Sequence, residues 1–348
     1  LDSSFGVIEK CQLTGNSSSD TVRFITGSGG QILDSTITGG KSGLLIERAS
    51  SALIGKSKAV TITGAETGIT VHGSSNVEII NTTINSNSGD GINANRNSSV
   101  YLGGDNTITN NGGYAVRLAR GSTLSNKCSK TNNISSNSKG VFIAMWGSEA
   151  SLCNMTLSSN GVIISAQTNS TVFLTDSSIT SSSERVIDSK GGVALEIDNT
   201  SITGNSSQEA VQLNDGSNLH ISGSTVSGGK AGISAVYNST VRLHGGNTIT
   251  GNAQHGIHLL NSTLHQYSDV STTTISSNTG SEIRAERSFL SLDGVTITGT
   301  GGSTEVDLRY GSLLMLGSGS SVTGTVNCGN TAPDNGTFVN DSGTTVTT

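Results

Sequence analysis

The chain has 348 residues and a formal net charge of −6, with 3% aromatic and 13% charged residues. A negative charge without a basic cluster argues against nucleic acid as a partner, and no apolar run is long enough to span a bilayer. Ile, Val and Leu recur regularly among abundant Ser, Thr, Asn and Gly, which excludes a disordered chain and predicts a narrow aliphatic core.

A short segment of the type Thr-Ile-Thr-Gly recurs along the whole chain, each time around one central aliphatic residue. Successive central residues are 22 to 26 positions apart. They are Leu13, Ile37, Ile62, Ile84, Ile108, Ile134, Leu157, Ile179, Ile202, Val226, Ile249, Ile275, Ile297 and Val322. The spacing predicts about 14 coils of 22–26 residues over residues 1–326, followed by a polar C-terminal tail over residues 327–348.

Each repeat contains three short strands in which apolar and polar residues alternate, the pattern of a strand with one buried face. The first strand surrounds the central aliphatic residue. The second opens with a small residue and an aliphatic one, as in Gly91-Ile92, and the third follows a Ser-rich turn, as in Val100-Tyr101-Leu102. Three strands and three turns per repeat predict an all-β, three-sided solenoid of parallel strands.

An Asn stands three residues after the central aliphatic residue in many coils. These residues are Asn16, Asn87, Asn111, Asn137, Asn160, Asn205, Asn252 and Asn278. Gly40 and Gly229 occupy the same position in two other coils. Asn and Gly both tolerate positive φ, so we predict a left-handed bend at this position. Stacked Asn amides would also hydrogen-bond from coil to coil as a ladder.

In this repeat, its three strands and its Asn positions, the sequence resembles the right-handed parallel β-helix superfamily over essentially its whole length. That superfamily includes pectate-lyase-like enzymes, the periplasmic NosD-like family and autotransporter passengers. The resemblance implies a single right-handed parallel β-helix. It says little about function, because the fold hosts many unrelated activities.

The four cysteines fall into two pairs. Cys128 and Cys153 are 25 residues apart, about one coil, a separation that a disulfide accepts. They form either a disulfide, which would indicate an oxidising compartment, or two free thiols. Cys11 and Cys328 lie in the first and last coils and are either unrelated thiols or inter-subunit contacts of stacked copies. The spacing does not fit a zinc site, and we predict no metal or other cofactor.

The second strands carry the densest set of charged residues, namely His258, Arg284, Glu286, Asp307 and Arg309. As a catalytic set, they would act on a polysaccharide as an acid/base pair with basic residues. As a structural set, Arg284 over Asp307 and Glu286 over Arg309 would form a ladder of alternating sign between coils, which is the favoured interpretation. Trp146, the one tryptophan, ends an apolar stretch that is either an exposed patch or a locally widened core.

The first strands carry ranks of hydroxyl side chains on both sides of the central aliphatic residue. Examples are Thr36 with Thr38 and Thr107 with Thr109. This array resembles the Thr-x-Thr face of β-helical ice-binding proteins. Ser and Asn interrupt it in several coils, and Thr is favoured on exposed sheets in any case.

We therefore predict a secreted or cell-surface β-solenoid with a structural or adhesive role rather than a catalytic one. A start at Leu1 without a signal peptide fits a processed chain. Neither terminal segment predicts a capping helix, so one form of this hypothesis is a fibre subunit that associates head to tail. The alternatives are a polysaccharide lyase, hydrolase or binding module that uses the second-strand face, and an ice-binding protein.

Overall fold

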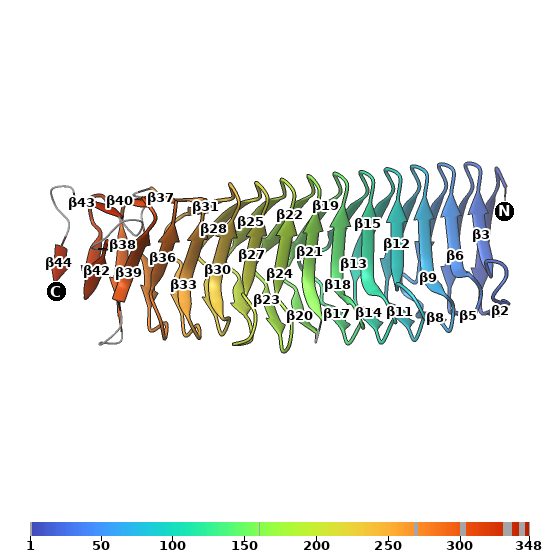
Figure 1. Cartoon of the computed structure of the whole chain (residues 1–348). Helices are drawn as coiled ribbons and strands as arrows, with labels where there is room; N and C mark the ends of the chain where they lie inside the picture. The colour runs from blue at the N-terminus through green and yellow to red at the C-terminus, as the bar shows by residue number, and fades with distance from the viewer. Residues whose placement is uncertain are drawn as a thin grey trace. The chain divides into compact units, whose positions relative to one another are not determined.

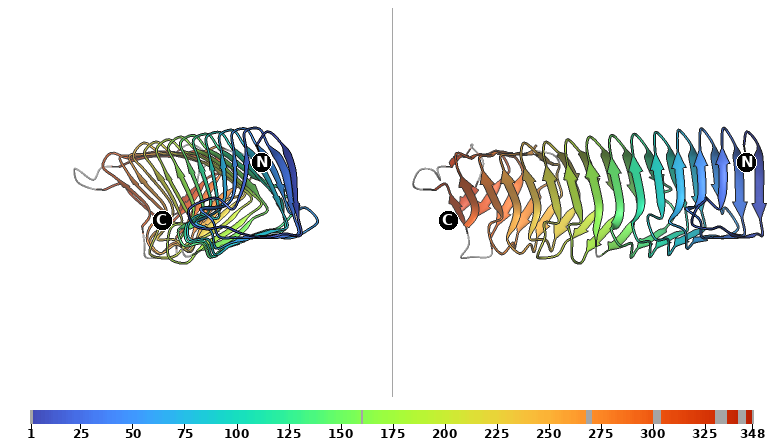
Figure 2. Two further views of the ribbon diagram at one scale, coloured as in Figure 1. Left: turned by 90° about the vertical axis from the view of Figure 1, so that its right-hand side faces the viewer. Right: turned by 45° about the vertical axis from the view of Figure 1, so that its right-hand side comes forward.

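The computed structural model describes residues 2–159, 161–267, 271–299, 304–329, 336–340 and 345–347 (Figure 1). Every helix-or-strand element in these ranges is a β-strand. The chain divides by its internal contacts into unit 1, Leu1–Phe173, and unit 2, Leu174–Thr348. Each unit is a stack of coils in which three parallel sheets are built from every third strand, as the two views in Figure 2 show.

In unit 1, the sheets are named after the strand that each coil contributes. The first-strand sheet contains β2 (Gln12–Thr14), β5 (Ser35–Thr38), β8 (Val60–Thr63), β11 (Thr82–Asn85), β14 (Asn106–Thr109), β17 (Asn132–Ser135) and β20 (Thr156–Ser159). The second-strand sheet contains β3 (Val22–Ile25), β6 (Ser42–Glu47), β9 (Thr67–His72), β12 (Ile92–Asn95), β15 (Tyr114–Ala119), β18 (Gly140–Met145) and β21 (Val162–Gln167). The third-strand sheet contains β1 (Phe5–Glu9), β4 (Gly29–Leu33), β7 (Ser51–Ile54), β10 (Asn76–Ile80), β13 (Ser99–Gly104), β16 (Thr123–Asn126) and β19 (Glu149–Cys153). Strand β22 (Thr171–Thr175) spans the division between the units.

Unit 2 repeats the same plan. Its first-strand sheet contains β23 (Ser178–Ser181), β26 (Ser201–Thr203), β29 (Thr225–Ser227), β32 (Thr248–Thr250), β35 (Thr273–Ser276), β38 (Val295–Thr298), β41 (Ser321–Thr323) and β44 (Thr345–Thr347). Its second-strand sheet contains β24 (Ile187–Lys190), β27 (Val211–Asn214), β30 (Ala231–Val236), β33 (His255–Leu260), β36 (Ile283–Glu286), β39 (Thr304–Arg309) and β42 (Thr325–Asn327). Its third-strand sheet contains β25 (Ala194–Asp198), β28 (Asn218–Ser222), β31 (Thr240–Leu243), β34 (Thr263–Gln266), β37 (Phe289–Leu292), β40 (Leu313–Leu316) and β43 (Thr337–Asn340).

The core of each coil is formed by aliphatic residues that stack in register. Ile62, Ile84 and Ile108 are fully buried, and each pairs with its equivalent in the next coil. Alternate residues of a strand point to opposite faces, so the flanking Thr and Asn side chains point outward. The prediction of an all-β, three-sided solenoid is confirmed.

The stack continues beyond residue 326, where the sequence analysis places its end. Strand β43 pairs with β40, and β44 pairs with β41, both in the parallel sense. Phe338 pairs with Leu314 and Val346 pairs with Val322, so these apolar residues keep the register of the repeat. The described parts of residues 327–348 therefore belong to the sheets rather than to a separate tail.

The Asn ladder is present in both units and links successive coils. In unit 1, Asn87 Nδ2 donates to Asn111 Oδ1, and Asn111 Nδ2 donates to Asn137 Oδ1, both at 2.9 Å. In unit 2, Asn252 Nδ2 donates to Asn278 Oδ1 at 2.8 Å. All five side chains are buried, and the same Oδ1 atoms also accept backbone N–H groups of the preceding coil.

Three other residues of the expected set are not seen in the ladder. Asn16 and Asn205 are not buried, and their Oδ1 atoms accept the backbone N–H groups of Ser18 and Ser207, each at 3.0 Å. Asn16 therefore stabilises its own turn. Asn205 also donates its Nδ2 to the Glu184 carbonyl of the preceding coil at 2.8 Å. Asn160 lies outside the described residues.

The left-handed bend beside the ladder lies one residue earlier than predicted. The positive φ values belong to Ser86, Asn110 and Ser136, which precede Asn87, Asn111 and Asn137. The ladder side chain must point inward to reach its neighbour, so the preceding residue reverses the chain direction.

A second ladder lies in the turn between second and third strands, where the sequence analysis saw only a Ser-rich turn. The backbone N–H of Ser50 donates to Ser75 Oγ at 3.1 Å, and that of Ser98 donates to Ser122 Oγ at 3.2 Å. Each hydroxyl in turn donates to the carbonyl three residues earlier, as Ser98 does to Asn95 at 2.8 Å. The recurrence of Ser at coil-length spacing was the signal in the sequence that identifies this ladder.

Candidate functional site

The charged set expected on the second strands lies together on unit 2. Two columns of these residues pair in register between coils. The first contains His258 on β33, Arg284 on β36 and Asp307 on β39. The second contains Glu286 and Arg309, two residues further along β36 and β39. The columns predicted for these residues are therefore confirmed. Alternate residues of a strand share one face, so all five side chains lie on the outer face of the sheet.

Opposite charges stack between coils as predicted, Arg284 over Asp307 and Glu286 over Arg309. The ion pairs themselves form within each strand. Arg284 Nη2 lies 2.8 Å from Glu286 Oε1, and Arg309 Nε lies 2.8 Å from Asp307 Oδ2. Residues i and i+2 of a strand are neighbours on one face, so long Arg side chains reach along the strand. The carboxylates of Glu286 and Asp307 are each held by an arginine.

Two histidines border these ion pairs. The ring centroids of His255 and His258 are 5.8 Å apart. Burial, followed by the positive charges of His258 and Arg284, lowers the pKa of His255 to about 4. Burial also lowers the pKa of His258. Both imidazoles are therefore neutral at pH 7, and within the described residues no three His, Cys, Asp or Glu side chains are grouped to hold a metal ion.

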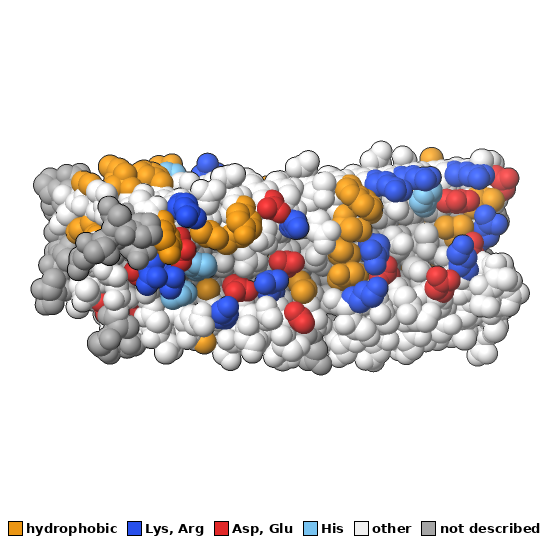
Figure 3. Space-filling view, in the orientation of Figure 1, with side chains coloured by type: hydrophobic (Ala, Val, Ile, Leu, Met, Phe, Trp, Pro, Cys, Tyr) orange, Lys and Arg blue, Asp and Glu red, His pale blue; other side chains and the backbone are white. Residues whose placement is uncertain are grey.

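A groove on the second-strand face of unit 1 was not identified from the sequence. Its volume is about 480 Å³. The floor is formed by Asn93 and Asn95 of β12, and the sides by Arg117, Lys139 and Trp146. In Figure 3, the right half of the visible face shows a hydrophobic patch that adjoins basic side chains. Trp146, which ends the apolar stretch noted in the sequence, is 50% exposed, as one of its two interpretations predicted.

The floor of this groove has acceptors that no protein group satisfies. Asn93 Oδ1 and Asn95 Oδ1 are buried atoms without a hydrogen-bond partner in the described structure. Asn93 lies between Thr70 and Arg117, and Asn95 lies between His72 and Ala119. Buried polar atoms are nearly always hydrogen-bonded in folded proteins, so these two oxygens mark the floor as a place where a ligand or water donates.

One side of the groove is held rigid by an ion pair. Arg117 Nε lies 2.5 Å from Asp90 Oδ2, and Asp90 Oδ1 accepts the backbone N–H of Tyr114 at 2.8 Å. The guanidinium also lies over the Tyr114 ring, 5.3 Å from its centroid. Asp90 thus fixes both the loop before β15 and the arginine that faces the groove.

The turns that follow the second strands beside the groove present large side chains from left-handed backbone, and one of these side chains, Trp146, lines the groove. Arg96, Arg120 and Trp146 occupy equivalent positions in three successive coils. Their φ values are 57°, 52° and 54°. Arg48 occupies the same position two coils before Arg96. The Arg120 guanidinium lies 5.3 Å from the Trp146 ring centroid. Bulky residues rarely adopt positive φ, so the conformation is imposed by the turn and its serine ladder.

Aromatic rings also gather on the third-strand face of unit 2. The ring centroids of His220 and His244 are 3.9 Å apart, and those of His265 and Tyr267 are 6.1 Å apart. Burial and then the charge of His244 lower the pKa of His220. These rings contact one another.

The hydroxyl ranks of the first strands are present but interrupted. In unit 1, Thr61, Thr83 and Thr107 pair in register, and the next residue in that column is Asn133. The neighbouring column contains Asn85 between Thr63 and Thr109. Ice binding by this face stays a prediction.

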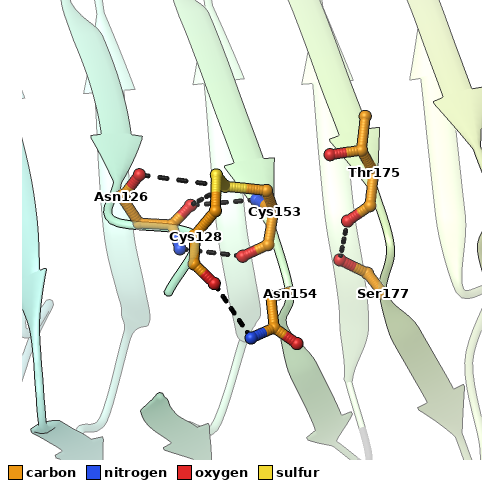
Figure 4. The surroundings of a disulfide bond; sticks show 6 residues. All are labelled: Asn126, Cys128, Cys153, Asn154, Thr175 and Ser177. Carbon is orange, nitrogen blue, oxygen red and sulfur yellow. Dashed lines mark hydrogen bonds between the residues drawn. A yellow bond between two sulfur atoms is a disulfide. The ribbon is translucent and has the colours of Figure 1, made fainter. Parts of the chain in front are cut away.

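Cys128 and Cys153 form a disulfide between neighbouring coils of unit 1, with 5.0 Å between their Cα atoms (Figure 4). Asn126 and Cys153 exchange two hydrogen bonds of 2.9 Å, and Asn154 Nδ2 donates to the Cys128 carbonyl at 2.9 Å. Of the two states predicted for this pair, the disulfide is confirmed. Cys11 and Cys328 are free thiols, and burial raises the pKa of Cys328.

Together, the fold and these outer faces define a parallel β-solenoid with polar, outward-facing sheets. The sequence matches the family described as the right handed beta helix region over residues 1–157 and again over residues 142–307. The chain belongs to the right-handed β-helix family. The described residues contain no helix that is long and apolar enough to cross a membrane.

Several chains of solved structures are similar to this one, including the following two. A chain of the Vag8–C1 inhibitor complex has a TM-score of 0.68 and 14% identity, over 91% of this chain and 79% of that chain. The periplasmic alginate epimerase AlgG has a TM-score of 0.56 and 11% identity, over 94% of this chain and 78% of that chain. Identity this low shows a shared fold alone. No curated protein sequence matches significantly.

Proposed function

We propose that this protein is a secreted or cell-surface β-solenoid with an adhesive, non-catalytic role, and that its second-strand face is the binding surface. The observation that carries the proposal is the pairing of the charged groups on that face. Glu286 is held by Arg284, and Asp307 is held by Arg309. A general acid or base must be able to exchange a proton with the substrate, and carboxylates committed to arginines are poorly suited to that role.

The Cys128–Cys153 disulfide supports the extracellular part of the proposal. Disulfides persist in secreted, periplasmic and surface proteins and are rare in reducing compartments. The similarity to a periplasmic protein, AlgG, is consistent with such a location. Fractionation of the native cells, followed by detection with an antibody, tests the location directly.

The enzymatic alternative makes a distinct prediction. The purified protein is incubated with polygalacturonate, alginate and a neutral glucan, and unsaturated products and reducing ends are measured. We expect retention on at least one polysaccharide without product formation. Product formation that is abolished by Glu286→Gln or Asp307→Asn would overturn the non-catalytic proposal.

Head-to-tail association is part of the structural form of this proposal, with Cys11 and Cys328 as the inter-subunit residues. Burial raises the pKa of Cys328, which disfavours the reactive thiolate, so we propose that any such contact is non-covalent. Size-exclusion chromatography with light scattering tests it, using Cys11→Ser and Cys328→Ser variants. Oligomers that vanish in these variants under non-reducing conditions would contradict a non-covalent contact, and monomers at every concentration would contradict association.

A further inference from the structure

We propose that the groove on unit 1 binds a polysaccharide that carries carboxylate or sulfate groups. Trp146, Asn93 and Asn95 contact its sugar rings. Lys139, Arg96 and Arg120 contact its acidic groups. The inference rests on the proposed adhesive function and names the ligand class of the second-strand face. Three independent features of the groove lead to it: its floor, its aromatic wall and its charge.

The floor selects for a ligand rich in hydroxyl groups. The oxygens of Asn93 and Asn95 are acceptors without a partner in the described structure. An amide oxygen accepts from N–H or O–H donors. Two such acceptors, two residues apart on β12, lie on one face of the strand. Sugar hydroxyls are donors of this kind, and a purely apolar ligand would leave both oxygens unsatisfied.

The wall offers an apolar surface beside these acceptors. Trp146 is 50% exposed, and Met145 lines the groove next to it. The flat indole can cover the C–H face of a sugar ring while the ring's hydroxyls reach the polar floor. The Arg120 guanidinium on the indole holds that side chain in place. An apolar wall with a few convergent polar groups is the usual composition of a ligand site.

The charge selects for an acidic sugar. Arg117 is neutralised by Asp90. Lys139 lines the groove. Arg96 and Arg120 are exposed and directly follow the lining residues Asn95 and Ala119 in the chain. None of these three has an ion-pair partner among the described residues. The other lining carboxylate, Glu66, offsets the charge of Lys139, so the positive excess comes from Arg96 and Arg120 beside the groove. This basic zone belongs to a chain of net charge −6, so it is a local feature and not a consequence of overall composition.

The repeat of the fold matches a polymer. Arg96, Arg120 and Trp146 follow one another at the spacing of adjacent coils, about 4.8 Å. A chain of sugars laid along the stack would meet one of these residues at each coil. Guanidinium groups bind carboxylate and sulfate oxygens by paired hydrogen bonds.

The test measures binding of the whole protein to four immobilised polysaccharides by biolayer interferometry. These are polygalacturonate, fully methyl-esterified polygalacturonate, chondroitin sulfate and dextran. We expect binding to polygalacturonate or chondroitin sulfate, or both, that weakens as salt rises. The esterified polymer keeps the sugar backbone without its charge, so we expect binding to it to be at least about tenfold weaker.

Matched variants separate the groove from the rest of the molecule. Trp146→Ala and Arg120→Gln should each weaken binding by about tenfold, as loss of a central contact does. Their controls are Tyr237→Ala and Arg287→Gln, which occupy the same left-handed turn position on unit 2. The controls should change affinity by less than about twofold. Circular dichroism verifies that each variant is folded.

Several results would overturn the inference. The first is binding to dextran as tight as binding to the acidic polymers. The second is a loss of affinity in the control variants equal to that in the groove variants. The third is that neither acidic polymer is bound. Any of these would leave the adhesive proposal intact. Cleavage products from an acidic polymer would instead contradict the non-catalytic proposal, whatever the affinity.

Discussion

At the scale of single residues, buried amides determine how neighbouring coils are joined. Asn111 donates to Asn137 and to the carbonyl of Ile84, and it accepts from the side chain and backbone of Asn87. Every polar atom of this side chain is thereby satisfied in an aliphatic interior. Removing one residue leaves the groups of its neighbours buried and unpaired.

We therefore expect Asn111→Ala to lower the free energy of unfolding of unit 1 by about 2–3 kcal/mol, the cost of orphaned buried groups. Urea denaturation followed by circular dichroism measures the change. The control is Asn16→Ala, where the exposed side chain only supports its own turn, and there the loss should stay within about 0.5 kcal/mol. Equal losses in both variants would show that the ladder contributes nothing specific.

Two carboxyl groups occupy a position that holds Gly or Ala in many other coils, as at Ala210 and Gly256. Glu282 and Glu305 are 1% and 3% exposed. Glu282 accepts the backbone N–H of Asn278 at 3.2 Å and also its side-chain amide, so it ends the Asn ladder of unit 2. Burial is the main cause that raises the pKa of Glu282 above its usual 4.5, and the nearby Glu305 adds to it.

A raised pKa means that the folded state binds the proton more tightly than the unfolded state. Glu282 therefore contributes stability below about pH 4.5, and this contribution is lost as pH rises through its folded pKa. Glu282→Gln should unfold at a higher temperature than the parent at pH 7 and at the same temperature near pH 4. Exposed Glu149→Gln is the control and should leave the profile unchanged. If the unfolding temperature of Glu282→Gln followed that of the parent at a constant offset over this pH range, Glu282 would not be the source of the pH dependence.

At the scale of elements, each strand is stabilised by its equivalents in neighbouring coils, and the disulfide reinforces one such step. It joins the segment after β16 to the end of β19, and its two cysteines are 25 positions apart in the sequence. Closing a loop of this length restricts the unfolded chain and stabilises the fold by about 3 kcal/mol in the loop-entropy model.

We expect the double variant Cys128→Ser, Cys153→Ser to lose about 3 kcal/mol of unfolding free energy. A reducing agent should shift the parent to the same value and leave the double variant unchanged. The double variant Cys11→Ser, Cys328→Ser serves as the control, because both thiols are free. An effect of the reducing agent on the variant that lacks Cys128 and Cys153 would contradict this explanation.

At the scale of the whole molecule, each coil contacts only its neighbouring coils. Pairings join strands three apart in the chain, as β11 joins β8 and β14. Stability in such a chain is close to a sum of terms between adjacent repeats. A local defect should therefore remain local.

Hydrogen exchange followed by mass spectrometry tests whether a defect in one coil stays local. In Asn111→Ala, exchange should increase in β11, β14 and β17 and their corner turns, and the peptides of β30, β33 and β36 should exchange as in the parent. An increase of equal size in both sets would show that the chain opens as one cooperative unit.

The sequence by itself determined the coil length, the three strands of each coil and the inward residues, because a period of two within strands and of 22 to 26 between coils leaves few other ways to bury Ile62, Ile84 and Ile108. It also placed Arg284 opposite Asp307 and brought Cys128 within reach of Cys153. Register follows directly from the repeat, so these placements needed no coordinates.

The tertiary structure alone decided how side chains use those placements. The repeat cannot say whether Arg284 reaches across to the next coil or along its own strand to Glu286, because both partners lie on one face. It does not distinguish Asn111, which turns inward, from Asn16, which turns out. The groove of unit 1 depends on loops of variable length closing around Asn93, and their geometry follows from packing rather than periodicity.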